Sequence, residues 1–150
     1  MQIRDNLVAD HSINYFHVQE GKFPVNASLQ RIGEDYLLSI WGGKAHIGAV
    51  AMAQPRPSLE RASRVSATAS VFCYLGHKED DLVKRISEKM AAALNTKVVV
   101  TAGLHWDNIS RSEIDQIVRN VDTLVERILG ADRDEHGVED PPRQNHGPDS

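Results

Sequence analysis

One junction constrains the fold of this chain most strongly, because it predicts a buried strand that leads through a short polar loop into a long helix. Residues 97–102 (Lys-Val-Val-Val-Thr-Ala) form a β-branched run that is typical of a buried strand. The polar stretch Gly103–Asn108 follows, and Ser110 and Glu113 then have the spacing of a helix capping box. A loop held firmly at both ends, and carrying polar side chains, is a good position for a functional site.

The helix after this junction is predicted to run from Arg111 to Leu129 and to end at Gly130. Its apolar residues repeat with a period of 3.6, which predicts one continuous buried face. The predicted stripe consists of Ile114, Ile117, Val118, Val121, Leu124, Val125 and Ile128.

The first half of the domain has the patterns of β-strands. The alternating stretch Ala27–Ile32 and the stretch Tyr36–Trp41 are separated by a turn at Gly33–Asp35, so the pair reads as a hairpin. A strand of small residues is expected at His46–Ala53. The stretch Val65–Leu75 alternates between hydroxyl-bearing and apolar residues, which predicts a strand with one face toward the core.

A second helix is expected from about Glu79 to Leu94, with acidic residues in its first turn and Asn95 as its C-terminal cap. Its predicted buried residues are Leu82, Ile86, Met90 and Ala93. Several strands, a helix, one strand and a helix predict an α+β two-layer sandwich, in which a mostly antiparallel sheet carries two long helices on one face.

Length and composition bound the domain organisation. The chain has 150 residues, which corresponds to one domain. We expect an irregular N-terminal arm with some strand content at residues 1–25, a single α+β domain at 26–130, and a disordered C-terminal tail at 131–150, where almost no apolar residue occurs.

The charge and the apolar pattern exclude several classes of partner. The net charge is −4, with acidic and basic residues interspersed, so no nucleic-acid or membrane partner is expected. The single cysteine, Cys73, suits a reducing compartment, and no signal peptide or membrane-spanning run is visible. These features predict a cytoplasmic protein.

Three polar loops share a composition and follow predicted strands. They are Gly42–His46, Gly76–Lys78 and Gly103–Asn108; each contains glycine and a histidine, and two contain a lysine. If the sheet brings the loops together, glycine amides and lysines would suit a phosphate, and an aromatic wall from Trp106 or Trp41 would suit a flat ring. The candidate ligand-binding residues are Gly42, Gly43, Lys44, His46, His77, Lys78, His105, Trp106, Asp107 and Asn108.

Plainer readings of the same residues remain open. Gly42 and Gly43 also suit a hairpin turn, Lys78 also suits a solvated surface, and Trp106 also suits a plug that fills a gap. Three loop histidines could bind zinc, but none has the i,i+4 helical spacing of a metal motif, so the sequence favours no metal site. No Ser nucleophile elbow, Walker motif or dinucleotide fingerprint occurs, and Cys73 suits a small core residue.

The three loops together also identify a resemblance. Trp41–Ala51 (Trp-Gly-Gly-Lys-Ala-His-Ile-Gly-Ala-Val-Ala), Gly76–Asp80 (Gly-His-Lys-Glu-Asp) and Gly103–Ile109 (Gly-Leu-His-Trp-Asp-Asn-Ile) resemble, in order and spacing, the LpdD-like family. These proteins are accessory D subunits of gallate-type, UbiD-family decarboxylases and are described as prenylated-flavin chaperones. The resemblance covers about residues 27–129 and implies a fold related to proteasome-assembly chaperones.

The resemblance implies a carrier of reduced prenylated FMN that delivers this cofactor to a UbiD-family decarboxylase and is not itself an enzyme. Lys44 and Lys78 would then hold the phosphate, Trp106 or Trp41 would cover the ring, and His105 with Asp107 or Asn108 would bond its polar edge. A ligand-free assembly chaperone or structural accessory subunit is the alternative, followed by a small histidine-dependent enzyme. Sheets with exposed edges often pair, so a symmetric homodimer is expected.

Overall fold

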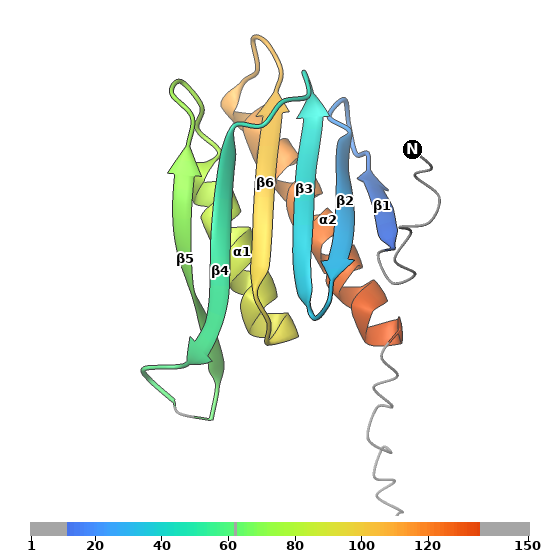
Figure 1. The fold of residues 1–150 in the computed structure, drawn as a ribbon. Helices are drawn as coiled ribbons and strands as arrows, with labels where there is room; N and C mark the ends of the chain where they lie inside the picture. Colours follow the sequence, from blue (N-terminus) through green and yellow to red (C-terminus); the bar gives the residue numbers. More distant parts are fainter. Residues whose placement is uncertain (1–11, 62, 136–150) are drawn as a thin grey trace, which may run out of the picture.

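The computed structural model describes residues 12–61 and 63–135, which form one sheet and two helices (Figure 1). The two helices lie side by side on the same face of the sheet, as predicted. The strands follow the order β1-β2-β3-β6-β4-β5 across the sheet. The elements are β1 (Ile13–Val18), β2 (Val25–Ile32), β3 (Asp35–Gly43), β4 (Ala49–Pro57), β5 (Val65–Cys73), α1 (Asp80–Leu94), β6 (Val98–His105) and α2 (Arg111–Glu135).

The strand pairing confirms an α+β sandwich with a mostly antiparallel sheet. β2 and β3 form the expected hairpin around Gly33, and only β3 and β6 run parallel. β6 lies between β3 and β4, so the chain from Gly43 to Gly48 crosses the end of β6. The alternative reading of Gly42 and Gly43 as a hairpin turn is therefore wrong, and β4 begins at Ala49 instead of His46.

The core lies between the sheet and the two helices. Every second residue of the central strands points into it, including Ala27, Leu38, Ile40, Val100 and Ala51, each almost fully buried. Small residues dominate β4 and β5, and α1 packs against these two strands, whereas α2 packs against β1 and β2. In β5, Ala67, Ala69 and Cys73 contact the core. Val65 and Val71 are on the same face of this edge strand, but their side chains are exposed.

The buried face of α1 is rotated from the prediction. It consists of Val83, Ile86, Ser87, Met90 and Ala91, whereas Leu82 is only partly buried and Ala93 is exposed. The sequence pattern hid this face because a polar residue lies at its centre. Ser87 is fully buried, and its hydroxyl donates to the Lys84 carbonyl at 3.0 Å, which satisfies the polar group inside the helix. Asn95 has the predicted left-handed C-cap conformation.

The predicted face of α2 is confirmed at its centre and wrong at its margin. Val121, Leu124 and Ile128 are among the most buried side chains of the molecule. Ile114 in the first turn is 46% exposed and Val118 is 37% exposed, so these two contribute little to the core. Neither of the two helices in the described residues is long and apolar enough to cross a membrane.

The structure describes parts of both segments that were expected to flank the domain, and the N-terminal one contains the strand content expected there. Ile13–Val18 pairs along its whole length with β2, so this part of the N-terminal arm is an ordered edge strand. At the other end, α2 continues through Gly130 to Glu135, and Asp132 accepts a hydrogen bond of 2.7 Å from the Tyr36 hydroxyl. The rest of the expected tail, residues 136–150, lies outside the described residues, as do residues 1–11.

Candidate functional site

The three polar loops meet at one edge of the sheet, which we call the loop edge (Figure 1). It consists of the β3–β4 connection (44–48), the β5–α1 connection (74–79) and the β6–α2 connection (106–110). These segments meet because β3, β5 and β6 all end on this side, with Gly43 opposite His105 and Cys73 opposite Ala49. Residues that are more than thirty positions apart in the sequence therefore become neighbours.

Glu79 joins the three loops through its carboxylate, and it is only 9% exposed. One oxygen, Oε1, accepts a hydrogen bond from the Leu104 amide at 3.3 Å and lies 3.2 Å from His46 Nε2. The other, Oε2, accepts from the Lys78 amide at 3.0 Å and lies 3.9 Å from His77 Nδ1. The pairing between β6 and β4 ends at Ala102, so the Leu104 amide has no acceptor on β4. The Glu79 carboxylate accepts its hydrogen bond instead.

Two glycines make room for this arrangement. A Cβ at Gly48 would lie 2.4 Å from a Glu79 carboxylate oxygen, and a Cβ at Gly103 would lie 1.7 Å from the His46 carbonyl oxygen. Neither distance is possible in a packed structure, so any side chain at either position would push the loops apart. The His46 and His77 rings then lie 4.7 Å apart, centroid to centroid.

Trp106 lies in the β6–α2 connection, and its ring packs against Phe23, Gly42 and Gly43. Its ring meets Phe23 edge-on, with centroids 5.5 Å apart and planes at 85°. It also covers Gly42 and Gly43, where an added Cβ would come within 2.8 Å of the indole. These contacts agree with the plug that the sequence left open as an alternative. Trp41 follows buried Ile40 in β3, so strand alternation places it on the face of the sheet away from the helices.

The remaining candidate residues are exposed at the loop edge. His105 Nε2 lies 2.9 Å from Asp107 Oδ1, and both side chains are more than half exposed. Asn108 is exposed and adopts a left-handed backbone conformation at φ 53°. Lys44 and Lys78 are exposed, and the Lys44 amide donates to the His105 carbonyl at 2.9 Å, which fixes the backbone beside the side chain.

Both helices begin at the loop edge, so their positive N-terminal ends point there. At α2 the predicted capping box is confirmed: the Ser110 amide donates to the Glu113 carboxylate at 3.0 Å, and the Glu113 amide donates to the Ser110 hydroxyl at 3.2 Å. Two hydrogen bonds lower the pKa of the Glu113 carboxyl below its usual value. The larger effect comes from the Ser110 amide, and the smaller one comes from the Ser110 hydroxyl.

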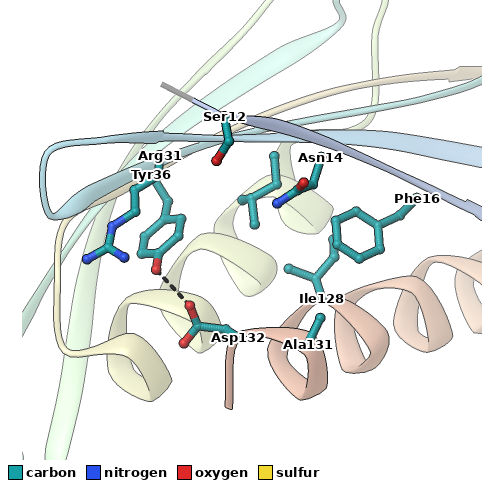
Figure 2. A pocket seen from close by; sticks show the side chains of 9 residues that line it. Ser12, Asn14, Phe16, Arg31, Tyr36, Ile128, Ala131 and Asp132 are labelled. Atoms are coloured by element: carbon teal, nitrogen blue, oxygen red, sulfur yellow. Dashed lines mark hydrogen bonds between the residues drawn. The ribbon is translucent and has the colours of Figure 1, made fainter. Parts of the chain in front are cut away.

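A hollow elsewhere in the molecule is too small for a flavin. It lies between the sheet and the end of α2, and Figure 2 shows Phe16, Ile128 and Ala131 on its walls, with the bond from Tyr36 to Asp132 at one side. It holds about 40 Å³ of free space. A cavity of this size holds water molecules, whereas pockets for drug-sized ligands measure roughly 300–1,000 Å³. This hollow therefore does not fit a large ring system.

The structure thus divides the ten candidate residues into separate groups. The rings of His46 and His77 lie against one another at a tilt of 33°, and His105 pairs with Asp107 instead of joining them. Gly42 and Gly43 lie under the Trp106 ring. The sequence reasoning missed Glu79, because an acidic residue at the start of a helix was explained by the helix dipole. No sequence spacing links residue 79 with residue 46, since only the folded sheet brings them together.

The chain was compared with protein-family models, known proteins and solved structures, and the part that matches a family model includes all three loops. Residues 19–131 match the family model described as the prenylated flavin chaperone LpdD-like domain. The protein LpdD of Lactiplantibacillus plantarum (strain ATCC BAA-793 / NCIMB 8826 / WCFS1) is 27% identical over 117 residues, which cover 76% of this chain and 81% of that protein. A chain from a chaperone complex for yeast 20S proteasome assembly aligns with a TM-score of 0.47 and 16% identity, over 85% of this chain and 99% of that chain.

Proposed function

Because the chain belongs to the LpdD-like family of prenylated-flavin chaperones, we propose that it binds reduced prenylated FMN at the loop edge and delivers it to a UbiD-family decarboxylase. The observation that carries the proposal is the convergence of three polar loops, two lysines and two helix N-termini on one edge of the sheet. The hollow of Figure 2, by contrast, is too small for the ring system.

The phosphate is assigned to Lys44 and Lys78. Both side chains are exposed, so neither is needed for the core, and both lie on loops that the Glu79 carboxylate ties together. A phosphate near these lysines would also lie close to the positive end of a helix. The donor groups of this edge therefore fit the anionic end of a flavin nucleotide, with His46 and His77 between the two lysine-bearing loops.

The ring is assigned to the β6–α2 connection. His105, Asp107 and Asn108 present exposed donors and acceptors to the polar edge of a flavin. Trp106 is held by Phe23, so it would offer a fixed apolar border without moving to meet the ligand. An open site of this kind suits a carrier, because a ligand enclosed in a deep pocket would be slow to leave for the decarboxylase.

The proposed carrier performs no chemical step. The roles proposed for the polar groups of the loop edge are binding and release. The alternative is a ligand-free assembly chaperone whose loop edge contacts a partner subunit. The two proposals differ in one measurable property, which is the affinity for a flavin nucleotide.

The experiment is a titration with FMN and with riboflavin, followed by the fluorescence of Trp106 and Trp41. Lys44→Ala should weaken FMN binding by about 1.5–3 kcal/mol, or roughly ten- to a hundredfold, while riboflavin binding stays unchanged because it has no phosphate. Lys97→Ala is the matched control, since Lys97 is also exposed and pairs with Asp35 at the opposite end of the sheet. Equal losses for both ligands, or none for either, would contradict the phosphate assignment.

We also propose that two copies pair through the face of the sheet that the helices leave uncovered, which we call the open face. Strand alternation places Tyr15, Met52 and Phe72 on it, exposed by 74%, 64% and 61%. The charged residues that share this face lie toward the end opposite the loop edge, at Asp35–Lys97 and at Arg56. An uncharged centre with exposed apolar side chains and with charges at its margin is typical of a protein interface, and an identical face is its simplest match.

The oligomeric state tests this pairing. Met52→Lys places a charge at the centre of the open face and should convert a dimer to a monomer in size-exclusion chromatography with light scattering. Ile114→Lys is the control, because Ile114 is exposed on α2, on the other side of the molecule. A monomeric wild type would reject the homodimer, and loss of decarboxylase binding in Met52→Lys would then assign the face to that partner.

A further inference from the structure

Three side chains at the loop edge form a cluster with the composition of a metal site. His46 comes from the β3–β4 connection, and His77 and Glu79 come from the β5–α1 connection. Their donor atoms all lie within 4.8 Å of one another, and this is the one such group of three or more within residues 12–61 and 63–135. Two imidazoles and one carboxylate are a ligand set found in zinc sites that keep an open position.

The distances agree with a shared cation. His46 Nε2 lies 3.2 Å from Glu79 Oε1, and His77 Nδ1 lies 3.9 Å from Glu79 Oε2. Ligands that surround zinc tetrahedrally at about 2.0–2.2 Å are separated from one another by roughly 3.3–3.6 Å. The distance between His46 and Glu79 is close to this range, and the wider separations in the cluster, up to 4.8 Å, would shorten when an ion binds.

The hydrogen bond on the far side of His46 orients its ring as in metal-binding histidines. Nδ1 lies 2.8 Å from the Lys44 carbonyl oxygen. A carbonyl can only accept, so the proton of the neutral ring is on Nδ1 and the lone pair of Nε2 points at Glu79. The contact with Glu79 therefore needs either a second ring proton or a metal cation between the two atoms, and a backbone carbonyl behind the ring is the usual outer partner of a ligating histidine.

Glu79 is also fixed before any ion binds. Its two oxygens accept from the amides of Leu104 and Lys78, and its side chain is 10% exposed. Burying a carboxylate requires compensation by hydrogen bonds and by positive charge, and the two amides supply only the hydrogen bonds. The side chains of His46 and His77 are 23% and 38% exposed, so an ion held by them can be reached from solvent.

We propose that His46, His77 and Glu79 bind a divalent transition-metal ion of the zinc class, with three protein ligands and one coordination position open to solvent. Imidazole nitrogen and carboxylate oxygen suit zinc, cobalt and nickel, whereas magnesium and calcium prefer oxygen ligands alone. The sequence alone favoured no metal, because it shows neither the meeting of the two histidines nor the carboxylate beside them. The proposed metal site does not depend on flavin binding, since none of its ligands needs the flavin to meet.

Cobalt(II) is the probe that tests the proposal. The full-length chain, freed of metal with a chelator, is titrated with Co²⁺ and followed by visible absorption. The expected result is one Co²⁺ per chain, with the intense visible bands of four-coordinate geometry, which disappear when one equivalent of Zn²⁺ displaces the cobalt. A cluster held together by protons alone would give no such bands, and that result would overturn the proposal.

Variants assign the binding to these residues. His77→Ala removes one ligand from an exposed loop position and should weaken Co²⁺ affinity by at least about tenfold while the melting temperature stays close to that of the wild type. Glu79→Gln should weaken it similarly. His17→Ala is the matched control, because His17 is an exposed histidine of β1 that bonds Asn26.

The comparison of His77→Ala with the wild type also tests whether other histidines bind the cobalt. His11, His136 and His146 lie outside the described residues, and a site built from them would bind Co²⁺ equally well in His77→Ala and in the wild type. Equal affinity in these two proteins would therefore overturn the proposal, as would a loss of affinity in His17→Ala as large as that in His77→Ala.

Discussion

At the scale of single residues, Glu79 holds the loop edge together. It joins the β3–β4 and β5–α1 connections to the end of β6, through the Leu104 and Lys78 amides and the His46 ring. Without it, the amide of Leu104 would lie beyond the end of β4 without a strand to accept its hydrogen bond. The position of the candidate site therefore depends on one carboxylate that takes no part in the hydrophobic core.

Replacing this carboxylate tests that dependence. Glu79→Ala should lower the free energy of unfolding by about 1–3 kcal/mol, because it leaves a part-buried amide without its acceptor. Asp107→Ala is the matched control, since this carboxylate is on the same edge but its side chain is 87% exposed and pairs only with exposed His105. Urea denaturation measures both, and a loss in Glu79→Ala no larger than in Asp107→Ala would contradict the role given to Glu79.

At the scale of elements, α2 carries the largest share of buried side chains outside the sheet. Its central residues Val121, Leu124 and Ile128 are 0–1% exposed, whereas Val118 on the same helix is 37% exposed. Val118 and Val121 lie less than one helical turn apart and have the same helix propensity because both are valine. The main difference between these two positions is therefore burial. The helix therefore offers an internal comparison between its buried and outer faces.

Val121→Asp should cost several kcal/mol, enough to unfold a typical domain, because it buries a carboxylate without a partner. Val118→Asp should be tolerated, since its side chain can reach solvent at the margin of the same helix. Circular dichroism and thermal melts of the two variants measure the difference. Equal stabilities would mean that α2 does not pack as described.

The elements were predictable from the sequence to different degrees, for physical reasons. The capping box at Ser110 and Glu113 and the hairpin around Gly33 depend on local geometry, and both were predicted correctly. The buried face of α1 was misplaced because Ser87 satisfies its hydroxyl within the helix and so can lie in the core. The insertion of β6 between β3 and β4 depends on long-range pairing, which no local pattern specifies.

The candidate site was predictable only as separate pieces. Glycine-rich polar loops after strands indicated where ligand-binding residues lie in the sequence, and the fold places all three loops at one edge. Which of their side chains meet could not be predicted, because His46 and Glu79 are neighbours only through the crossover past the end of β6. The pairing of His105 with Asp107, away from the other two histidines, has the same origin.

At the scale of the whole molecule, two surfaces remain for recognition, because the helices cover only one face of the sheet. The loop edge is polar and carries Lys44 and Lys78, which suits an anionic ligand. The open face has an uncharged centre around Met52, which suits a second protein surface. The loop edge and the open face consist of different residues. A ligand at the loop edge therefore leaves the open face available for a second protein.

The most direct test of the proposed carrier is the absorbance spectrum of the purified protein. The chain is produced in cells that make prenylated FMN and purified without oxygen, beside a Lys44→Ala, Lys78→Ala double variant. The account predicts a flavin chromophore that copurifies with the wild type, is strongly reduced in the double variant, and transfers to an apo-decarboxylase of the UbiD family. A colourless wild type that still binds the decarboxylase would contradict the carrier and support a ligand-free assembly chaperone.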